Sequence, residues 1–181
     1  MSERTEKDVQ CEVTEALISA NMNPSVPFDV VKMARQFGFA VHNFRTIPKN
    51  VIGFMFLNMD KKMSRMVKSD KLIGLNFYHD EPHKRFAIAH ELGHFFMHYE
   101  ICKNKENPVF FHIRDNEEGI EGEACKFAAM LLMEKDLFSE NYYAFSENNF
   151  EEITIIRFLS EKFQTPQVSV RRRIQELRLN A

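Results

Sequence analysis

The chain has 181 residues, of which 44% are hydrophobic and 28% are charged, and this balance excludes a disordered chain. A net charge of −2 gives no global attraction to nucleic acid or to a membrane surface. The cysteines are Cys11, Cys102 and Cys125, an odd number without paired spacing, which argues against a disulfide framework. The charged segment MSERTEKDVQ predicts no secretory signal, and no window is apolar enough to span a membrane. We therefore expect a cytoplasmic protein.

The first half of the chain predicts two helices followed by three strands. The helices are expected over residues 9–20 and 28–37, and the strands over residues 39–44, 52–57 and 71–77. A basic segment, DKKMSRMVKSDK, joins the last two strands. It is interpreted as a solvated hairpin loop, with a patch that binds a partner as the alternative.

The second half predicts mainly helices. They are expected over residues 84–99, 121–133, 153–163 and 168–177, with a polar, irregular connection at 103–119 and a mixed segment at 134–149. We expect a domain over residues 1–150 and a C-terminal helical segment, similar to a helix-turn-helix, over residues 151–181.

Four arginines mark the last predicted helix: Arg171, Arg172, Arg173 and Arg178. They are interpreted as facing solvent or complementing the C-terminus of the helix. The alternative is a helix-turn-helix that binds DNA. A lone arginine triplet in an acidic chain is weak evidence for nucleic-acid binding, which we do not expect.

The segment RFAIAHELGHFFMH contains the motif H-E-x-x-H at His90, Glu91 and His94. Residues four apart lie on one face of a helix, so both imidazoles can point at one zinc ion. Glu91 leans toward the same site, where it can hold the water that zinc activates and accept its proton. The apolar residues before the motif are typical of a buried active-site helix. The alternative is a helix whose histidines only cap or pack.

A catalytic zinc site takes three protein ligands and leaves one position for water. Glu121 is the best candidate for the third ligand because it opens the amphipathic helix EGEACKFAAMLL. Glu123 is the competitor, rotated from Glu121 by about 200° on the helix. Cys125 is a further alternative, although a small buried cysteine is common in cores. Glu117 and Glu118 are weaker candidates in the polar connection.

His98 extends the motif to H-x-x-x-H-x-x-x-H. Nine residues of straight helix span about 12 Å, so three successive turns do not reach one ion. His98 is therefore interpreted as supporting a ligand or as packing. The remaining histidines near the motif are interpreted as surface or loop residues, although one of them, or a tyrosine, could stabilise an oxyanion. These residues are His79, His83, His112, Tyr78 and Tyr99.

The run RFAIAHELGHFFMH, followed by EGEACKFAAMLLM, resembles the ImmA/IrrE family of zinc metallopeptidases. Looser similarity at IGF, IGLN and LSEKFQTPQVSVRRRIQELRL extends the resemblance over most of the chain from about Phe28 on. The resemblance implies that His90, His94 and Glu121 bind zinc and that Glu91 is the general base. It also implies a zincin-like α+β fold with a small mixed β-sheet, an H-E-x-x-H helix and a helical C-terminal part.

The chain departs from the family pattern at two positions. Cys125 stands where the family usually has Asn, and we expect this position to support a zinc ligand, so that zinc affinity or rate differs. Glu134 stands where the family has Pro, which should affect only how that helix ends.

Members of the family act as regulatory proteases or antirepressors, often beside a helix-turn-helix repressor. The resemblance therefore implies a zinc-dependent endopeptidase that cleaves a regulatory protein at a specific site. A binding-type antirepressor, or a regulator associated with DNA, is the alternative. An extended substrate is expected to add to the sheet at strand 52–57 or 71–77.

Overall fold

Four strands form one small mixed sheet in the computed structural model, which describes residues 4–102, 109–112, 119–147 and 150–179. They are β1 (Phe39–Phe44), β2 (Val51–Phe56), β3 (Lys71–Asn76) and β4 (Val109–His112). Their order is β1-β3-β2-β4, with β1 parallel to β3 and the other neighbours antiparallel. The inner strands β2 and β3 are almost wholly buried, as their continuous apolar runs require.

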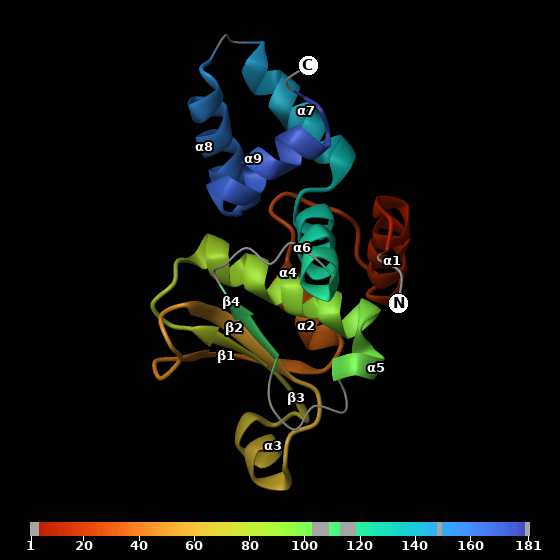
Figure 1. Cartoon of the computed structure of the whole chain (residues 1–181), viewed down its shortest axis with the longest axis vertical. Helices are drawn as coiled ribbons and strands as arrows, with labels where there is room; N and C mark the ends of the chain where they lie inside the picture. Colours follow the sequence, from red (N-terminus) through yellow and green to blue (C-terminus); the bar gives the residue numbers. More distant parts are fainter. Residues whose placement is uncertain (1–3, 103–108, 113–118, 148–149, 180–181) are drawn as a thin grey trace.

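Two long helices stack on this sheet. Helix α4 (Glu81–Met97) packs against β2 and β3, and α6 (Gly119–Leu132) packs against α4 (Figure 1). Helix α1 (Glu6–Ser19) covers α6, while α2 (Val30–Gln36) lies against β1 and α4. The core fills the layer between the sheet and α4 and the layer between α4, α6 and α1, and it continues into the C-terminal part, where Phe138, Leu159 and Phe163 belong to the same cluster.

Helices at the two ends complete the molecule. Figure 1 shows α3 (Lys61–Val67) at one end, beyond the sheet, and α7 (Lys135–Ser146), α8 (Glu152–Phe163) and α9 (Gln167–Glu176) together at the other. The short helix α5 (Tyr99–Cys102) follows α4. None of the helices in the described ranges is long and apolar enough to cross a membrane.

The expected class, a largely helical α+β fold with a small mixed sheet, is the class observed. The two helices and three strands expected in the first half are present, and so are the four helices expected in the second, with ends shifted by a few residues. Most of these elements bury several apolar residues, which is the signal that the sequence carries, whereas β1 buries only Phe39.

Three segments differ from the expectation. The basic segment expected as a hairpin loop contains α3, the connection at 103–119 contains β4, and the mixed segment at 134–149 contains α7. Helix α3 buries no residue and is defined by its ends, where the Asp60 carboxylate accepts from two backbone amides and Lys68 adopts a left-handed conformation. Helix α7 buries two residues and is capped by Glu134, which accepts from the amides of Asp136 and Leu137.

The expectation that strand 52–57 or 71–77 offers a free edge is wrong. Both β2 and β3 have a hydrogen-bonded neighbour on each side, so the edges of the described sheet are β1 and β4. Of the two roles expected for the arginines, Arg173 does not have the first, which is to face solvent: it is 2% exposed, lies in the last turn of α9 and donates to the Met133 carbonyl. Arg171, in contrast, is exposed as expected.

Candidate metal centre

Helix α4 carries the motif through the middle of the molecule. The Asp80 carboxylate caps its start by accepting from the backbone amide of His83, and Pro82 occupies the first turn. Sheet on one side and α6 on the other bury the central turns of α4. As a result His90, Glu91 and His94 are all fully buried.

The close approach of α4 and α6 depends on Gly93, inside the motif. A Cβ atom on Gly93 would lie 3.1 Å from the Cα and 3.2 Å from the carbonyl oxygen of Ala124, and 3.2 Å from the Cβ of Phe127. With only a hydrogen at Gly93, the first turn of α6 can lie beside the two histidines. This turn carries Glu121.

Three ligand atoms meet between the helices. The Nε2 atoms of His90 and His94 are 3.0 Å apart, and the Glu121 Oε2 lies 3.2 Å from the first and 3.3 Å from the second. These residues form a group that could hold a metal ion. Two of them come from α4 and one from α6, so the group exists only when the helices are packed.

The protonation states in this group suit metal binding. Burial lowers the pKa of His90 to about 4, although the Glu121 carboxylate opposes the shift. His90 is therefore neutral at pH 7 and has a lone pair to offer. Burial alone would raise the pKa of Glu121, but hydrogen bonds with His90 and His94 hold it well below the ordinary value. Glu121 is therefore an ionised carboxylate.

Glu91 is the one buried side chain among the described residues whose oxygens have no hydrogen-bond partner. Burial, and secondly the charge of Glu121, raise its pKa well above the ordinary value. An unpaired carboxyl in the interior costs several kcal/mol, roughly, unless a compensating group arrives. A cation or a water molecule beside the three ligands would be such a group.

The donor set fits a zinc ion. Zinc in proteins binds nitrogen and carboxylate oxygen at about 2.0–2.2 Å in a tetrahedron, whose edges are then about 3.3–3.6 Å long. The observed separations of 3.0–3.3 Å are close to such edges. Two imidazole nitrogens and one carboxylate oxygen are three protein ligands, the number that catalytic zinc sites use.

The other predicted candidates lie outside this triangle. The Cys125 Sγ is 3.4 Å from Nδ1 of His90, the ring nitrogen that faces away from the other ligands. The Nε2 atom of His98 contacts Glu123 at 2.9 Å, and Nδ1 of His98 contacts Nδ1 of His94 at 3.1 Å. Cys125 and His98 thus contact the ring nitrogens of His90 and His94 that are not directed at the other ligands. Glu123 contacts His98, which in turn contacts the ligand His94.

Several further candidates are engaged elsewhere or lie outside the described residues. His83 pairs with Asp80 at 2.6 Å, and His79 contacts the Lys49 carbonyl at 3.2 Å. Glu117 and Glu118 lie outside the described residues, and so does the side chain of His112. Tyr78 is 66% exposed and Tyr99 39%.

Sequence reasoning missed Arg4. Its backbone amide donates to Oε1 of Glu123 at 2.7 Å, and its guanidinium donates to Oε2 at 2.8 Å and to the Met97 carbonyl at 2.9 Å. These contacts join residues 119 and 93 positions apart in the chain. No motif or periodicity signals them.

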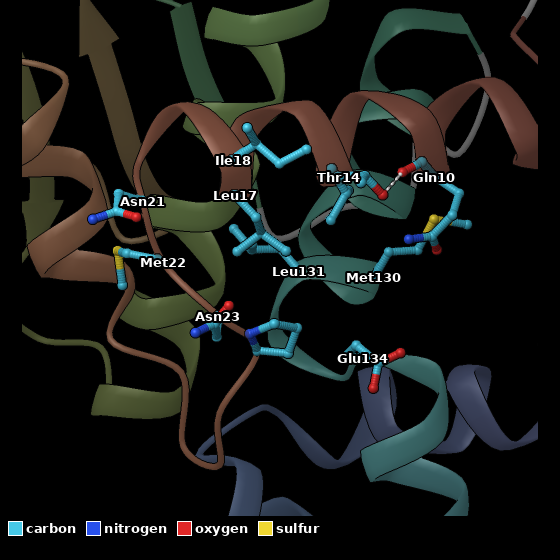
Figure 2. Close-up of a pocket in the computed structure, with 12 residues that line it drawn as sticks. Gln10, Thr14, Leu17, Ile18, Asn21, Met22, Asn23, Met130, Leu131 and Glu134 are labelled. Atoms are coloured by element: carbon cyan, nitrogen blue, oxygen red, sulfur yellow. Dashed lines mark hydrogen bonds between the residues drawn. The ribbon is translucent and has the colours of Figure 1, made fainter.

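A separate groove of about 440 Å³ lies between α1 and the end of α6, and the side chains that Figure 2 labels line it. Met130, Leu131 and Glu134 border it, about ten residues along from Glu121. At 1.5 Å per residue this is about 14 Å along the helix axis. The groove therefore does not open onto the three ligand atoms.

Comparisons with known proteins place the chain in a family. The family model of the IrrE N-terminal-like domain, a family of peptidases, matches residues 47–175. A solved structure titled "Mycobacterium tuberculosis transcriptional regulator" has the same fold, with a TM-score of 0.55 and 14% identity. The match covers 91% of this chain and 45% of that chain, so this chain spans less than half of its length.

A comparison with curated protein sequences found no match. The family match confirms the resemblance drawn from RFAIAHELGHFFMH and EGEACKFAAMLLM. It covers both helices that carry the ligand atoms, along with β2, β3 and the C-terminal helices. The chain therefore belongs to the family of peptidases that share the IrrE N-terminal-like domain.

Proposed function

We propose that this protein is a zinc-dependent endopeptidase that cleaves a regulatory protein at one or a few bonds. The observation that supports this most directly is the unpartnered, buried Glu91 carboxylate beside the triangle of His90, His94 and Glu121. A structural zinc site has four protein ligands and no use for a buried carboxylate that binds nothing. A hydrolytic site needs both an open position and a base.

In this proposal His90, His94 and Glu121 are the protein ligands of one zinc ion. The ion would polarise the scissile carbonyl and make a water molecule acidic enough to attack it. Glu91 would accept a proton from this water and pass it to the leaving amine. Burial raises the pKa of Glu91, which supports that role, because a carboxyl with a raised pKa is a stronger base than an ordinary one.

An extended peptide would bind by adding a strand to the sheet. Within the described residues only β1 and β4 have an open side. Of these, β1 is packed by α2, whereas β4 is the neighbour of β2, the strand on which α4 lies. We therefore favour β4 as the docking strand.

We propose a helix-turn-helix repressor as the substrate and the cytoplasm as the place of cleavage. An unrestricted protease would damage its own cell, so a single protein target is the more plausible use. Membership of the family supports a regulatory role. The similar solved structure is titled a transcriptional regulator, which fits a partner of that class.

The test is co-expression of the chain with each regulator encoded beside it, followed by measurement of the regulator's length by mass spectrometry. We expect one regulator to be shortened at one bond by the wild type and by Glu15→Gln, an exposed control on α1. The Glu91→Gln variant should retain one zinc per chain and leave the regulator whole, because an amide does not accept the proton.

Two results would overturn the proposal. Cleavage by Glu91→Gln at a rate near that of the wild type would exclude Glu91 as the base. Inactivation of an uncut regulator, equally by wild type and Glu91→Gln, would identify a binding-type antirepressor instead.

A further inference from the structure

We propose that His98 is a positioning residue that holds His94 in the tautomer able to bind zinc, and that Glu123 and Arg4 orient His98. This inference rests on the proposed zinc site. It adds a support for that site which begins in the N-terminal segment, before the residues that the family model matches.

The inference rests on a chain of hydrogen-bond contacts from Arg4 through Glu123 and His98 to His94. Nδ1 of His94 lies 3.1 Å from Nδ1 of His98, whose Nε2 lies 2.9 Å from Oε2 of Glu123. Arg4 donates to both oxygens of Glu123, from its backbone amide at 2.7 Å and its guanidinium at 2.8 Å. His98 is 1% and Glu123 3% exposed, so solvent does not compete for these bonds.

Because Arg4 can only donate, its hydrogen bonds to Glu123 determine which partner donates in the two bonds that follow, Glu123–His98 and His98–His94. Both contacts from Arg4 are donors, and they keep Glu123 ionised. The guanidinium of Arg4 is always charged and pairs with Oε2 of Glu123 at 2.8 Å, and donated hydrogen bonds favour the ionised form of a carboxyl. An ionised carboxylate only accepts, so Nε2 of His98 must carry a hydrogen.

A neutral His98 with its hydrogen on Nε2 has a bare Nδ1, which accepts. The facing Nδ1 of His94 must therefore donate, and the hydrogen of neutral His94 is then on Nδ1. Its Nε2 is left with a lone pair that points at His90 and Glu121, 3.0 Å and 3.3 Å away. The contacts from Arg4 through Glu123 and His98 thus place the hydrogen of His94 on Nδ1 before any ion binds.

The same contacts also anchor the N-terminal segment to α6, which would be a structural role alone. A structural anchor and a positioning residue differ in the quantity that a substitution changes, stability in the first case and zinc affinity in the second. A structural anchor stabilises the folded protein with and without zinc to the same extent. A positioning residue chiefly alters the zinc dissociation constant, because a wrong tautomer presents a hydrogen where the ion must bind.

The first test measures the zinc dissociation constant by competition with a chelator, together with the melting temperature of the zinc-free protein. We expect His98→Phe to weaken zinc binding by about 10–100-fold, the usual loss when the partner of a metal-binding histidine is removed. His98→Gln should recover most of this loss, because its amide offers one acceptor and one donor. The exposed control His42→Phe should bind zinc like the wild type.

A second variant avoids changes in the core. Arg4 has a side chain that is 25% exposed, so Arg4→Ala should fold. It removes the guanidinium and keeps the backbone amide, so we expect a smaller loss, about threefold to tenfold in zinc affinity. Lys7→Ala, an exposed cation on α1, is the matched control and should leave the affinity unchanged.

The third test reads the tautomers directly. Nitrogen-15 chemical shifts of the zinc-loaded wild type should show the hydrogen on Nε2 of His98 and on Nδ1 of His94. A hydrogen on Nδ1 of His98 would overturn the inference, and so would wild-type zinc affinity in both His98→Phe and Arg4→Ala. Failure of the wild type itself to bind zinc would instead overturn the proposed function, and the inference with it.

Discussion

Burial decides the charge of His90, and this makes the residue a source of acid sensitivity. Burial lowers its pKa in the folded, metal-free protein from the ordinary value of 6.5 to about 4, against the opposing effect of Glu121. In the unfolded chain the ordinary value applies. Between pH 6.5 and 4 the unfolded chain therefore binds more protons than the folded one, and the folded state loses stability as the pH falls.

We predict that the free energy of unfolding of the zinc-free protein declines from pH 6.5 to 4. One extra bound proton contributes a slope of at most about 1.4 kcal/mol per pH unit. Urea titrations across this range should show a smaller slope in His90→Gln than in the wild type. Equal slopes in the two proteins would contradict the prediction.

At this scale the placement of the motif residues follows from the sequence. The motif predicts that His90 and His94 meet, because residues four apart on one helix share a face, and their Nε2 atoms lie 3.0 Å apart. The choice of Glu121 over Glu123 was an expectation from one amphipathic pattern. In the structure Glu121 lies against both histidines and Glu123 faces His98.

At the scale of elements, the contact between α4 and α6 determines whether three ligands meet. Gly93 lets the backbones approach, and an added methyl group would meet the backbone of Ala124 at 3.1–3.2 Å. Because the obstacle is backbone, a flexible side chain does not move aside to relieve it. The helices must then shift apart, and Glu121 must move away from His90 and His94.

We predict that Gly93→Ala weakens zinc binding about tenfold, a loss on the scale of disturbed ligand support. Overpacking costs about 1–3 kcal/mol, and the better helix propensity of Ala offsets about 1 kcal/mol of it. The free energy of unfolding should therefore fall by no more than about 2 kcal/mol. Chelator competition and urea unfolding measure the two quantities.

Gly53→Ala is the matched control. An added Cβ there would also meet neighbours at 3.2 Å, but these are Ala87 on α4 and Gly74 on β3, away from α6. This variant should lose stability while keeping zinc affinity. The account of Gly93 is wrong if both alanine variants bind zinc as the wild type does.

Some elements were missed because their cause is local or tertiary. Helix α3 depends on its caps at Asp60 and Lys68 and buries nothing, so it has no hydrophobic period to detect. Strand β4 has four residues and is defined by its pairing with β2. The composition of four residues does not predict a strand, so β4 becomes evident only from its hydrogen bonds to β2.

At the scale of the whole molecule, Arg173 joins the C-terminal helices to the rest. Its side chain is 2% exposed and donates from Nε to the Met133 carbonyl at 3.1 Å, just after the end of α6. It also pairs with Glu176 at 3.1 Å. The arginine triplet, for which DNA binding was only the alternative interpretation, thus contains one residue that stabilises the packing of the C-terminal helices.

We predict that Arg173→Met lowers the free energy of unfolding by about 1–3 kcal/mol, the loss expected when a buried polar group is left without its partner. The exposed control Arg171→Met should change it by less than about 0.5 kcal/mol. Zinc affinity should be unchanged in both, because Met133 and Glu121 are about 18 Å apart along α6. A loss of zinc affinity in Arg173→Met would show that the C-terminal helices also support the metal centre.

The sequence by itself determined the helix that carries His90, Glu91 and His94, the strands of the inner sheet and the family to which the chain belongs. These depend on spacing along one element, which the covalent order fixes. Only the tertiary structure decided that Glu121 joins the histidines, that β2 and β3 have no free edge, and that Arg4 reaches the site through Glu123 and His98. The physical reason is that these depend on the packing of elements far apart in the chain, which no local pattern encodes.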